Sequence, residues 1–156
     1  MSAHESDHPD VIALPPYLFA GTLAAGLLLN RVWRPPFVPR PLATLAGAKW
    51  LLAGATSMVW AFTAMKRAGT NIDPYEPTTA VVESGPFAFS RNPVYLGMAC
   101  AYTGIATLAR APVALMLLPP LLALVQARVI EPEERYLEAK FGPAYLAYKA
   151  RVRRWL

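Results

Sequence analysis

The sequence predicts an all-α integral membrane bundle of about four transmembrane helices, followed by cytosolic amphipathic helices at the C-terminus. Composition is the first reason: of 156 residues, 55% are hydrophobic and 16% are charged, whereas soluble domains carry about 25% charged residues. The second reason is a series of four apolar segments, each close to the roughly 20 residues that cross a bilayer. A chain of this length suits one domain, residues 1–156.

The first two apolar segments cover residues 11–29 and 42–65. The first contains no charged residue, and its two prolines, Pro15 and Pro16, fall in the opening turns, where a helix tolerates proline. The second contains one charge, Lys49, close enough to the segment's end for its ammonium group to reach water. Both segments are therefore expected to span the membrane as helices.

The third and fourth apolar segments, residues 94–109 and 111–127, are separated only by Arg110. This spacing predicts a tight helical hairpin. Both segments are short, which suits a small tilt or a locally thin bilayer. Two adjacent prolines near the middle of the fourth segment are expected to bend it.

The remaining tail, residues 128–156, is amphipathic. Glu131 to Lys140 is typical of a helix, Gly142 is expected to end it, and Pro143 suits the first turn of another helix. Aromatic and apolar residues form one stripe of that last helix, and basic residues surround the stripe. The simplest interpretation is an interfacial helix that touches anionic lipid.

Lysine and arginine residues predict the orientation. With four spans, the termini and the loop 66–91 share one side, and that side carries ten basic residues against four on the other. The positive-inside rule then places both termini in the cytosol. We therefore expect an integral protein of the bacterial inner membrane with a cytosolic site.

The same distribution excludes other functional classes. The net charge of +5 comes from residues at the ends of apolar segments, which indicates a membrane protein without a nucleic-acid partner. His4 and His8 lie in a polar tail without a suitably spaced carboxylate or thiol, so no metal site is expected. The single cysteine, Cys100, excludes an internal disulfide.

Two polar clusters are expected on the cytosolic face. One is the stretch SGPFAFSRNPVYLG, residues 84–97, and the other is EPEERYLEAKFGPAYLAYKARVRRW, residues 131–155. They flank the predicted hairpin, so folding the hairpin brings them together into a pocket. Each residue alone has a plainer interpretation: Asn92 as a helix cap, Tyr95 as an interface aromatic, and the carboxylates of the second cluster as a solvated face.

In combination, these clusters resemble the isoprenylcysteine carboxyl methyltransferase and phospholipid methyltransferase superfamily. The resemblance runs from about Gly69 to the C-terminus, and its elements are GPF, RNPVY with the following glycine, EE with the following leucine, FG, and two tyrosines before RVRRW. It implies S-adenosylmethionine as cofactor, bound without a Rossmann domain. The cofactor-binding residues that it implies are Val81, Val82, Phe87, Asn92, Pro93, Val94, Tyr95 and Glu133.

The resemblance also implies methyl transfer to a lipid or another lipophilic small molecule, with acceptors that include carboxylates, amines and thiols. A carboxylate acceptor would need only a cation to orient it, and Arg128 or Arg154 would serve. An amine or thiol must lose a proton, for which Glu134 is the nearest candidate base. Asn92 stands where eukaryotic relatives have histidine, so a histidine base at this position is excluded.

Two alternatives remain open at the level of sequence. The first is a non-catalytic membrane scaffold or lipid-binding subunit with a decayed cofactor site, which binding of S-adenosylmethionine would exclude. The second is a transporter, which the sequence disfavours because its apolar segments lack midplane charges and paired repeats. The oligomeric state and the acceptor are not indicated by the sequence.

Overall fold

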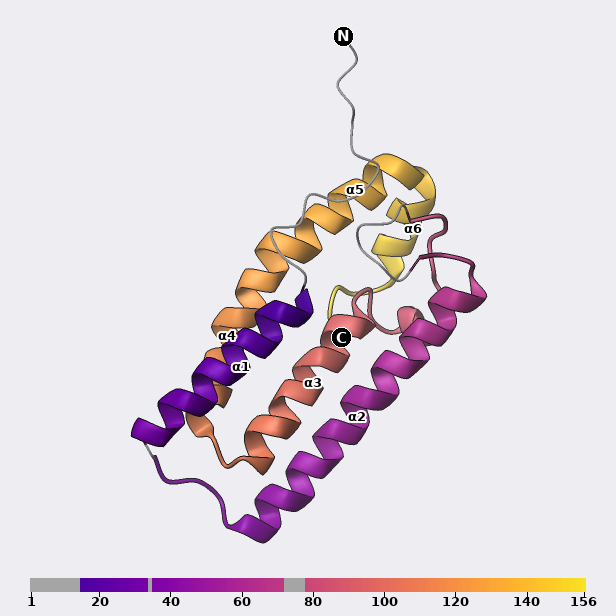
Figure 1. Ribbon diagram of the computed structural model, residues 1–156. Helices are drawn as coiled ribbons and strands as arrows, with labels where there is room; N and C mark the ends of the chain where they lie inside the picture. Colours follow the sequence, from indigo (N-terminus) through magenta and orange to yellow (C-terminus); the bar gives the residue numbers. More distant parts are fainter. Residues whose placement is uncertain (1–14, 34, 72–77) are drawn as a thin grey trace.

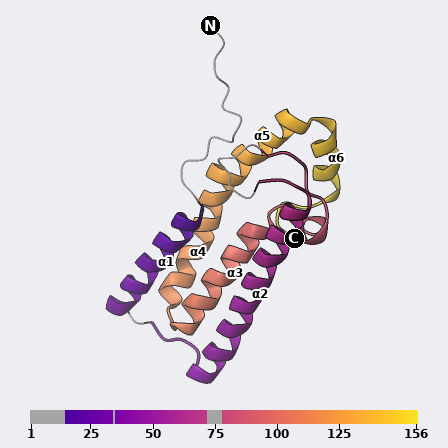
Figure 2. The ribbon, with the colours of Figure 1, turned by 45° about the vertical axis from the view of Figure 1, so that its right-hand side comes forward.

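The computed structural model describes residues 15–33, 35–71 and 78–156, and every regular element within these ranges is helical. Four long helices run side by side; the fourth continues into a shorter helix beyond one end of this bundle, and a last short helix folds back at that end (Figures 1 and 2). The all-α prediction is thus confirmed for the described residues. The elements are α1 (Pro15–Val32), α2 (Arg40–Arg67), the 3₁₀ turn η1 (Gly85–Ala88), α3 (Pro93–Leu108), α4 (Pro112–Val125), the π-helical turn η2 (Gln126–Ile130), α5 (Glu131–Phe141) and α6 (Pro143–Arg151).

The core lies between α1, α3 and α4. The ring of Phe19 meets that of Tyr102 edge-on at 6.4 Å, and the Tyr102 hydroxyl donates a hydrogen bond to the Ala114 carbonyl at 2.8 Å. Buried residues continue from α4 through η2, where Val129 and Ile130 have no exposed surface. This continuous packing fixes the position of α5 relative to α3.

Glycines hold α2 and α3 close together. A Cβ atom built on Gly54 would lie 2.7 Å from the Gly97 carbonyl oxygen, and one on Gly104 would lie 2.7 Å from the Leu51 nitrogen. Larger residues would therefore push the two backbones apart. The packing brings the C-terminal end of α2 beside the first turn of α3.

Two helices in the described part of the chain are long and apolar enough to cross a membrane. They are α2, with 28 residues, and the continuous helix Pro112–Phe141, with 30. Helix α3 is apolar but has 16 residues, or about 24 Å at 1.5 Å per residue. Helix α1 is not among the helices that are both long and apolar enough. Four separate spans are thus more than the described residues support, and residues 11–14 of the first predicted span lie outside them.

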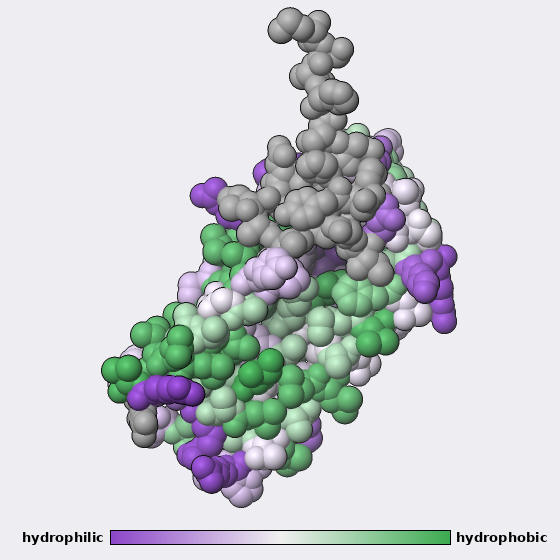
Figure 3. Space-filling model, viewed as in Figure 1, coloured by the Kyte–Doolittle hydropathy of each residue, from purple (hydrophilic) through white to green (hydrophobic). Residues whose placement is uncertain are grey.

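The surface coloured by hydropathy is consistent with membrane association. On the face in Figure 3, hydrophobic residues cover the middle of the bundle and strongly hydrophilic residues gather toward its two ends. Several large apolar side chains of α2 are exposed, among them Leu52, Val59 and Trp60. An apolar surface of this kind on a helix of spanning length favours contact with lipid.

The fourth span is predicted to end at residue 127, but the helix that contains it does not end there. The helix widens into the π-helical turn η2 and continues directly into α5. Pro132 accounts for the widening, because it lacks an N–H for the carbonyl four residues earlier and its ring clashes with that carbonyl. Pro119 and Pro120 lie inside α4 without ending it. One unbroken helix therefore connects the hairpin to the acidic residues of α5.

The tail helices agree with the prediction. Gly142 ends α5 with a positive φ of 52° and ψ −126°, a conformation that favours glycine. Pro143 begins α6, which folds back toward the first turn of α3. The chain after α6 thereby comes to lie against the residues before α3.

Candidate active site

A cavity of about 320 Å³ lies at the end of the bundle where α2 ends and α3 begins. Its walls come from these two helices, the first residues of α1, the 78–82 segment, η1, α5 and α6. Most lining residues are apolar or aromatic, with a few polar groups among them. Small-molecule sites are typically concave, apolar and supplied with a few placed polar groups.

The turn that precedes α3 is built by its glycine, proline and serine. Gly85 has φ 63°, a conformation suited to glycine, and Pro86 follows it in η1. The Ser90 hydroxyl then accepts a hydrogen bond from the Asn92 backbone N–H at 3.1 Å, and Pro93 opens α3. This geometry places Asn92 and the first turn of α3 in the cavity wall.

The two predicted clusters meet at Tyr95 and Glu133. The Tyr95 hydroxyl donates a hydrogen bond to Glu133 Oε1 at 2.7 Å, although the residues are 38 positions apart. Both side chains line the cavity and both are partly buried. Among the described residues, the Glu133 carboxylate has this hydroxyl as its hydrogen-bond partner and takes part in no ion pair.

The neighbouring carboxylate, Glu134, is in the opposite situation. Its side chain is 6% exposed and is held by two guanidinium groups, Arg91 Nη2 at 2.8 Å from Oε1 and Arg154 Nη2 at 2.9 Å from Oε2. Arg154 Nε adds a second bond to Oε1 at 3.1 Å. Burial of an unpaired carboxylate is costly, and here the guanidinium groups offset that cost.

Arg91 links this ion-pair cluster to the cavity. Its Nη1 donates to the Lys149 carbonyl at 3.1 Å, and its side chain is 9% exposed. Among the described residues its Nε is buried without a hydrogen-bond partner. An unsatisfied buried donor costs about 1–3 kcal/mol, and because Arg91 forms part of the cavity wall, a bound ligand is one source of the missing acceptor.

Two tyrosines of α6 close the cavity from the other side. Tyr148 donates a hydrogen bond from its hydroxyl to the Phe87 carbonyl at 2.8 Å, and its ring lies 6.0 Å from that of Tyr145. Burial raises the pKa of both hydroxyls, and the Glu134 carboxylate raises the pKa of Tyr145 further. Both hydroxyls are therefore protonated hydrogen-bond donors at neutral pH.

The structure brings most of the predicted site residues together. The predicted residues that line the cavity are Val81, Val82, Phe87, Asn92, Val94, Tyr95, Glu133 and Glu134. Pro93 is buried beneath them and does not line this cavity. Asn92 also donates from its side-chain amide to the Arg154 carbonyl at 3.0 Å. This amide nitrogen is therefore already used in a hydrogen bond within the protein.

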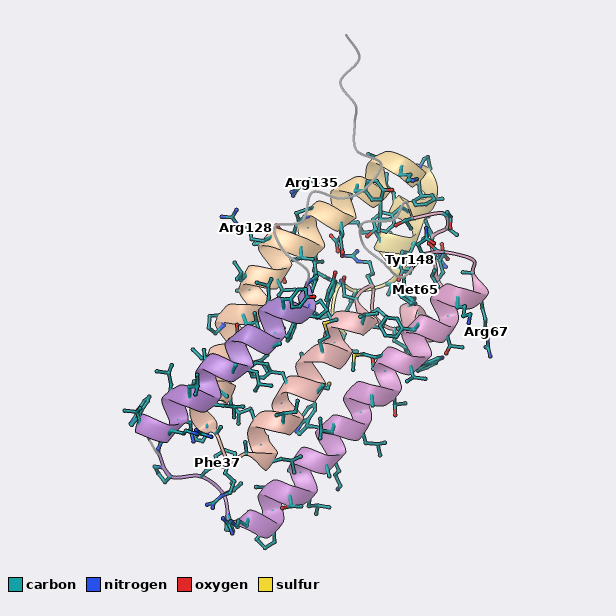
Figure 4. All side chains as sticks on the ribbon, viewed as in Figure 1. Phe37, Met65, Arg67, Arg128, Arg135 and Tyr148 are labelled. Atoms are coloured by element: carbon teal, nitrogen blue, oxygen red, sulfur yellow. The ribbon has the colours of Figure 1, made fainter. Side chains whose placement is uncertain are left out.

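The two predicted arginines are not cavity residues. Arg154 lies behind Glu134 and binds it, so its guanidinium is already engaged. Hydrogen bonding to Glu134 raises the pKa of Arg154, which keeps it charged. Arg128 is exposed on η2 and points away from the bundle (Figure 4). The structure therefore does not support Arg128 as a substrate-orienting residue.

Several cavity residues were not predicted. Arg91 lies inside the RNPVY motif, so the sequence carried a signal for it. Phe62 and Met65 of α2 and Met98 of α3 also line the cavity, and Met65 and Tyr148 are labelled at this end of the bundle in Figure 4. No motif marks these apolar residues, because their place depends on how α2 pairs with α3.

Comparison with known proteins agrees with this geometry. Neither a curated protein nor a solved structure matches the chain. A family model described as phospholipid methyltransferase matches residues 42–144, which include nearly all of α2, the α3–α4 hairpin, α5 and the first residues of α6. The match covers well over half of the chain and contains the whole of the first cluster, residues 84–97, and the first part of the second, residues 131–144. The chain therefore belongs to the phospholipid methyltransferase family.

Proposed function

We propose that this protein transfers a methyl group from S-adenosylmethionine to a lipid or another lipophilic acceptor at the membrane surface. Family membership supports methyl transfer in general. The observation that carries the more specific proposal is the contact between Tyr95 and Glu133 in the wall of one cavity. It joins the two motifs that the resemblance associates with the cofactor.

The residues of the cavity fit this cofactor. The cavity volume of about 320 Å³ lies within the roughly 300–1,000 Å³ usual for small-molecule sites. Glu133 offers a carboxylate that no cation of the described residues neutralises, next to the aromatic ring of Tyr95, and both features favour a cationic ligand. The unpartnered Nε of Arg91 suits an anionic group on the same ligand.

Each side chain then has a defined task. S-Adenosylmethionine, when bound, supplies an electrophilic methyl group on a sulfonium centre. Val81, Val82 and Phe87 provide the apolar wall expected for an adenine ring. The Tyr95 hydroxyl fixes the orientation of Glu133, and Tyr145 and Tyr148 exclude water from the α6 side. Alignment in a dry pocket is the main contribution that such residues make to group transfer.

The hydrogen bonds around the two carboxylates favour Glu133 over Glu134 as the base. Both oxygens of Glu134 are bound by guanidinium groups, so this residue is a poor proton acceptor. Glu133 lines the same cavity and pairs only with a hydroxyl. We therefore assign proton removal to Glu133 for an amine or thiol acceptor, whereas a carboxylate acceptor needs no base.

The acceptor side of the proposal rests on the apolar part of the wall. Phe62 and Met65 from α2 and Met98 from α3 line the cavity next to the polar groups, and α2 is a helix of spanning length. A lipophilic acceptor can approach along such helices from the bilayer, while the cofactor arrives from the cytosol. Four spans with both termini in the cytosol remain part of the proposal.

Calorimetric titration of the purified protein with S-adenosylmethionine, in detergent or nanodiscs, tests the cofactor. Saturable binding at one site per chain is expected, and absence of binding contradicts the proposal and favours a non-catalytic scaffold. Incubation of membrane extracts with methyl-labelled cofactor then identifies the acceptor. The label is expected in the lipid-soluble fraction, and label found only in water-soluble products contradicts a lipophilic acceptor.

A further inference from the structure

The last residues of the chain return to the turn that precedes α3. The Arg153 carbonyl accepts a hydrogen bond from the Arg91 backbone N–H at 3.0 Å. The Arg154 carbonyl accepts two more, from the Asn92 side-chain amide at 3.0 Å and from the Ser90 hydroxyl at 3.2 Å. We call residues 153–156 the C-terminal strap.

The strap also binds the other wall of the cavity through side chains. The Arg154 guanidinium holds Glu134 at 2.9 Å and Glu131 at 3.3 Å. One residue later, the Trp155 indole N–H donates to Gln126 Oε1 at 3.0 Å. The strap is therefore bonded both to the Ser90–Asn92 turn and to the continuous helix that carries α5.

We infer that the C-terminal strap is a positioning segment of the cofactor site, an inference that rests on the proposed function. Neither Arg153 nor Arg154 lines the cavity, so the strap acts through the residues that it holds. It anchors the turn that carries Arg91 and Asn92, and it anchors Glu134 next to Glu133. By fixing both walls, it fixes the separation across which Tyr95 reaches Glu133.

The two arginines of the strap separate side-chain effects from backbone effects. Arg154 uses both its carbonyl and its guanidinium, which binds the buried Glu134. Arg153 uses its carbonyl, and its exposed side chain makes no hydrogen bond or ion pair among the described residues. Arg153→Ala is therefore a matched control for Arg154→Ala, with the same loss of charge one position away.

Calorimetry with S-adenosylhomocysteine provides the first test. Arg154→Ala is expected to weaken binding roughly tenfold or more. Glu134 loses a charged hydrogen-bond partner, and α5 loses the ion pairs that connect it to the strap. Arg154→Lys is expected to recover part of the affinity, and Arg153→Ala to bind within about twofold of wild type. Melting temperatures in the same detergent check that each variant is folded.

Limited digestion with trypsin provides a second test that does not depend on any variant folding. If the docked strap favours ligand binding through the residues that it holds, ligand binding must in turn stabilise the docked strap. S-Adenosylhomocysteine is therefore expected to slow cleavage of the wild-type protein after Arg153 several-fold. An unrelated nucleoside at the same concentration serves as the control and should leave the rate unchanged.

The outcomes distinguish this inference from the proposed function. Absence of ligand binding to the wild-type protein contradicts the proposed function and the positioning role with it. Binding to the wild type together with equal affinities in the two alanine variants overturns the positioning role alone. Cleavage after Arg153 at the same rate with and without bound ligand also overturns it.

Discussion

At the scale of single residues, two adjacent glutamates have opposite environments. Glu134 is enclosed by Arg91 and Arg154, whereas Glu133 faces the cavity with the Tyr95 hydroxyl as its partner. A solvated helix face would expose both carboxylates to water. The structure instead gives one carboxylate a task in holding the protein together and leaves the other directed at the cavity.

Substitution of Glu133 tests this division. Glu133→Gln retains size and hydrogen bonding but removes the charge, so loss of a charge-assisted bond should weaken S-adenosylmethionine binding by about 1.5–3 kcal/mol, or roughly ten- to a hundredfold. Glu138→Gln, on the same helix but outside the cavity, should bind like wild type. Titration calorimetry measures both, and equal affinities for the two variants would contradict a role for Glu133.

The contact between Tyr95 and Glu133 permits a double-mutant cycle. Tyr95→Phe removes only the hydroxyl and should cost about 0.5–1.5 kcal/mol of cofactor binding. In the protein that also carries Glu133→Gln, the same change should cost less, because its partner has already lost its charge. Calorimetric affinities for the four proteins give the coupling, and strictly additive losses would mean that the hydrogen bond does not act in binding.

At the scale of elements, the close packing of α2 against α3 brings the cavity wall of α2 into position. A Cβ atom on Gly54 would meet the Gly97 carbonyl oxygen at 2.7 Å, and this neighbour is backbone that cannot rotate away. Gly21 of α1 has no atom within 4 Å of the equivalent position. A side chain at residue 54 would therefore clash with α3, whereas a side chain at residue 21 would meet no neighbouring atom.

This contrast gives a matched pair of variants. Gly54→Ala should lower the free energy of unfolding by about 1–3 kcal/mol, because the added methyl group forces the backbones of α2 and α3 apart. Gly21→Ala should be neutral or stabilising by up to about 1 kcal/mol, because alanine favours the helix and meets no neighbour. Thermal unfolding in one detergent compares them, and equal stability of the two variants would be inconsistent with this packing.

The elements also explain what the sequence could and could not predict. Arg110 and Pro112 signalled the hairpin, and Gly142 and Pro143 signalled the turn between the tail helices, because these residues act through their own backbone. The helix was expected to end before Arg128, but Pro132 is accommodated by a π-helical turn, which propensity does not reveal. The guanidinium partners of Glu134 depend on tertiary packing and have no local signal.

At the scale of the whole molecule, both motif clusters and the C-terminal strap lie at one end of the bundle. The chain has ten lysine and arginine residues in the segments expected on that side, against four on the other. For a bundle that carries most of its basic residues and its cavity at the same end, the positive-inside rule predicts a single orientation.

Reporter fusions test that orientation. A reporter at residue 1 and a reporter at residue 156 should both be active only on the cytosolic side, since the positive-inside rule places the basic end there. The control is a fusion in the 35–39 connection, which the same topology places on the opposite side of the membrane from both termini. This fusion should give the opposite result. An external C-terminus would contradict the proposed site, because the cofactor is cytosolic.

The unbroken helix from α4 into α5 has a consequence for the depth of the reaction. Glu133 lies six residues beyond Ala127, the last residue before the charged part, which at 1.5 Å per residue is about 9 Å along the helix. If the hydrocarbon region ends near Ala127, as the four-span topology predicts, this height places Glu133 outside the hydrocarbon interior, near the outer edge of the headgroup layer. For the proposed methyl transfer we therefore expect the length of this helix to select acceptors by depth: groups held at the water boundary come within reach, and groups buried among acyl chains do not.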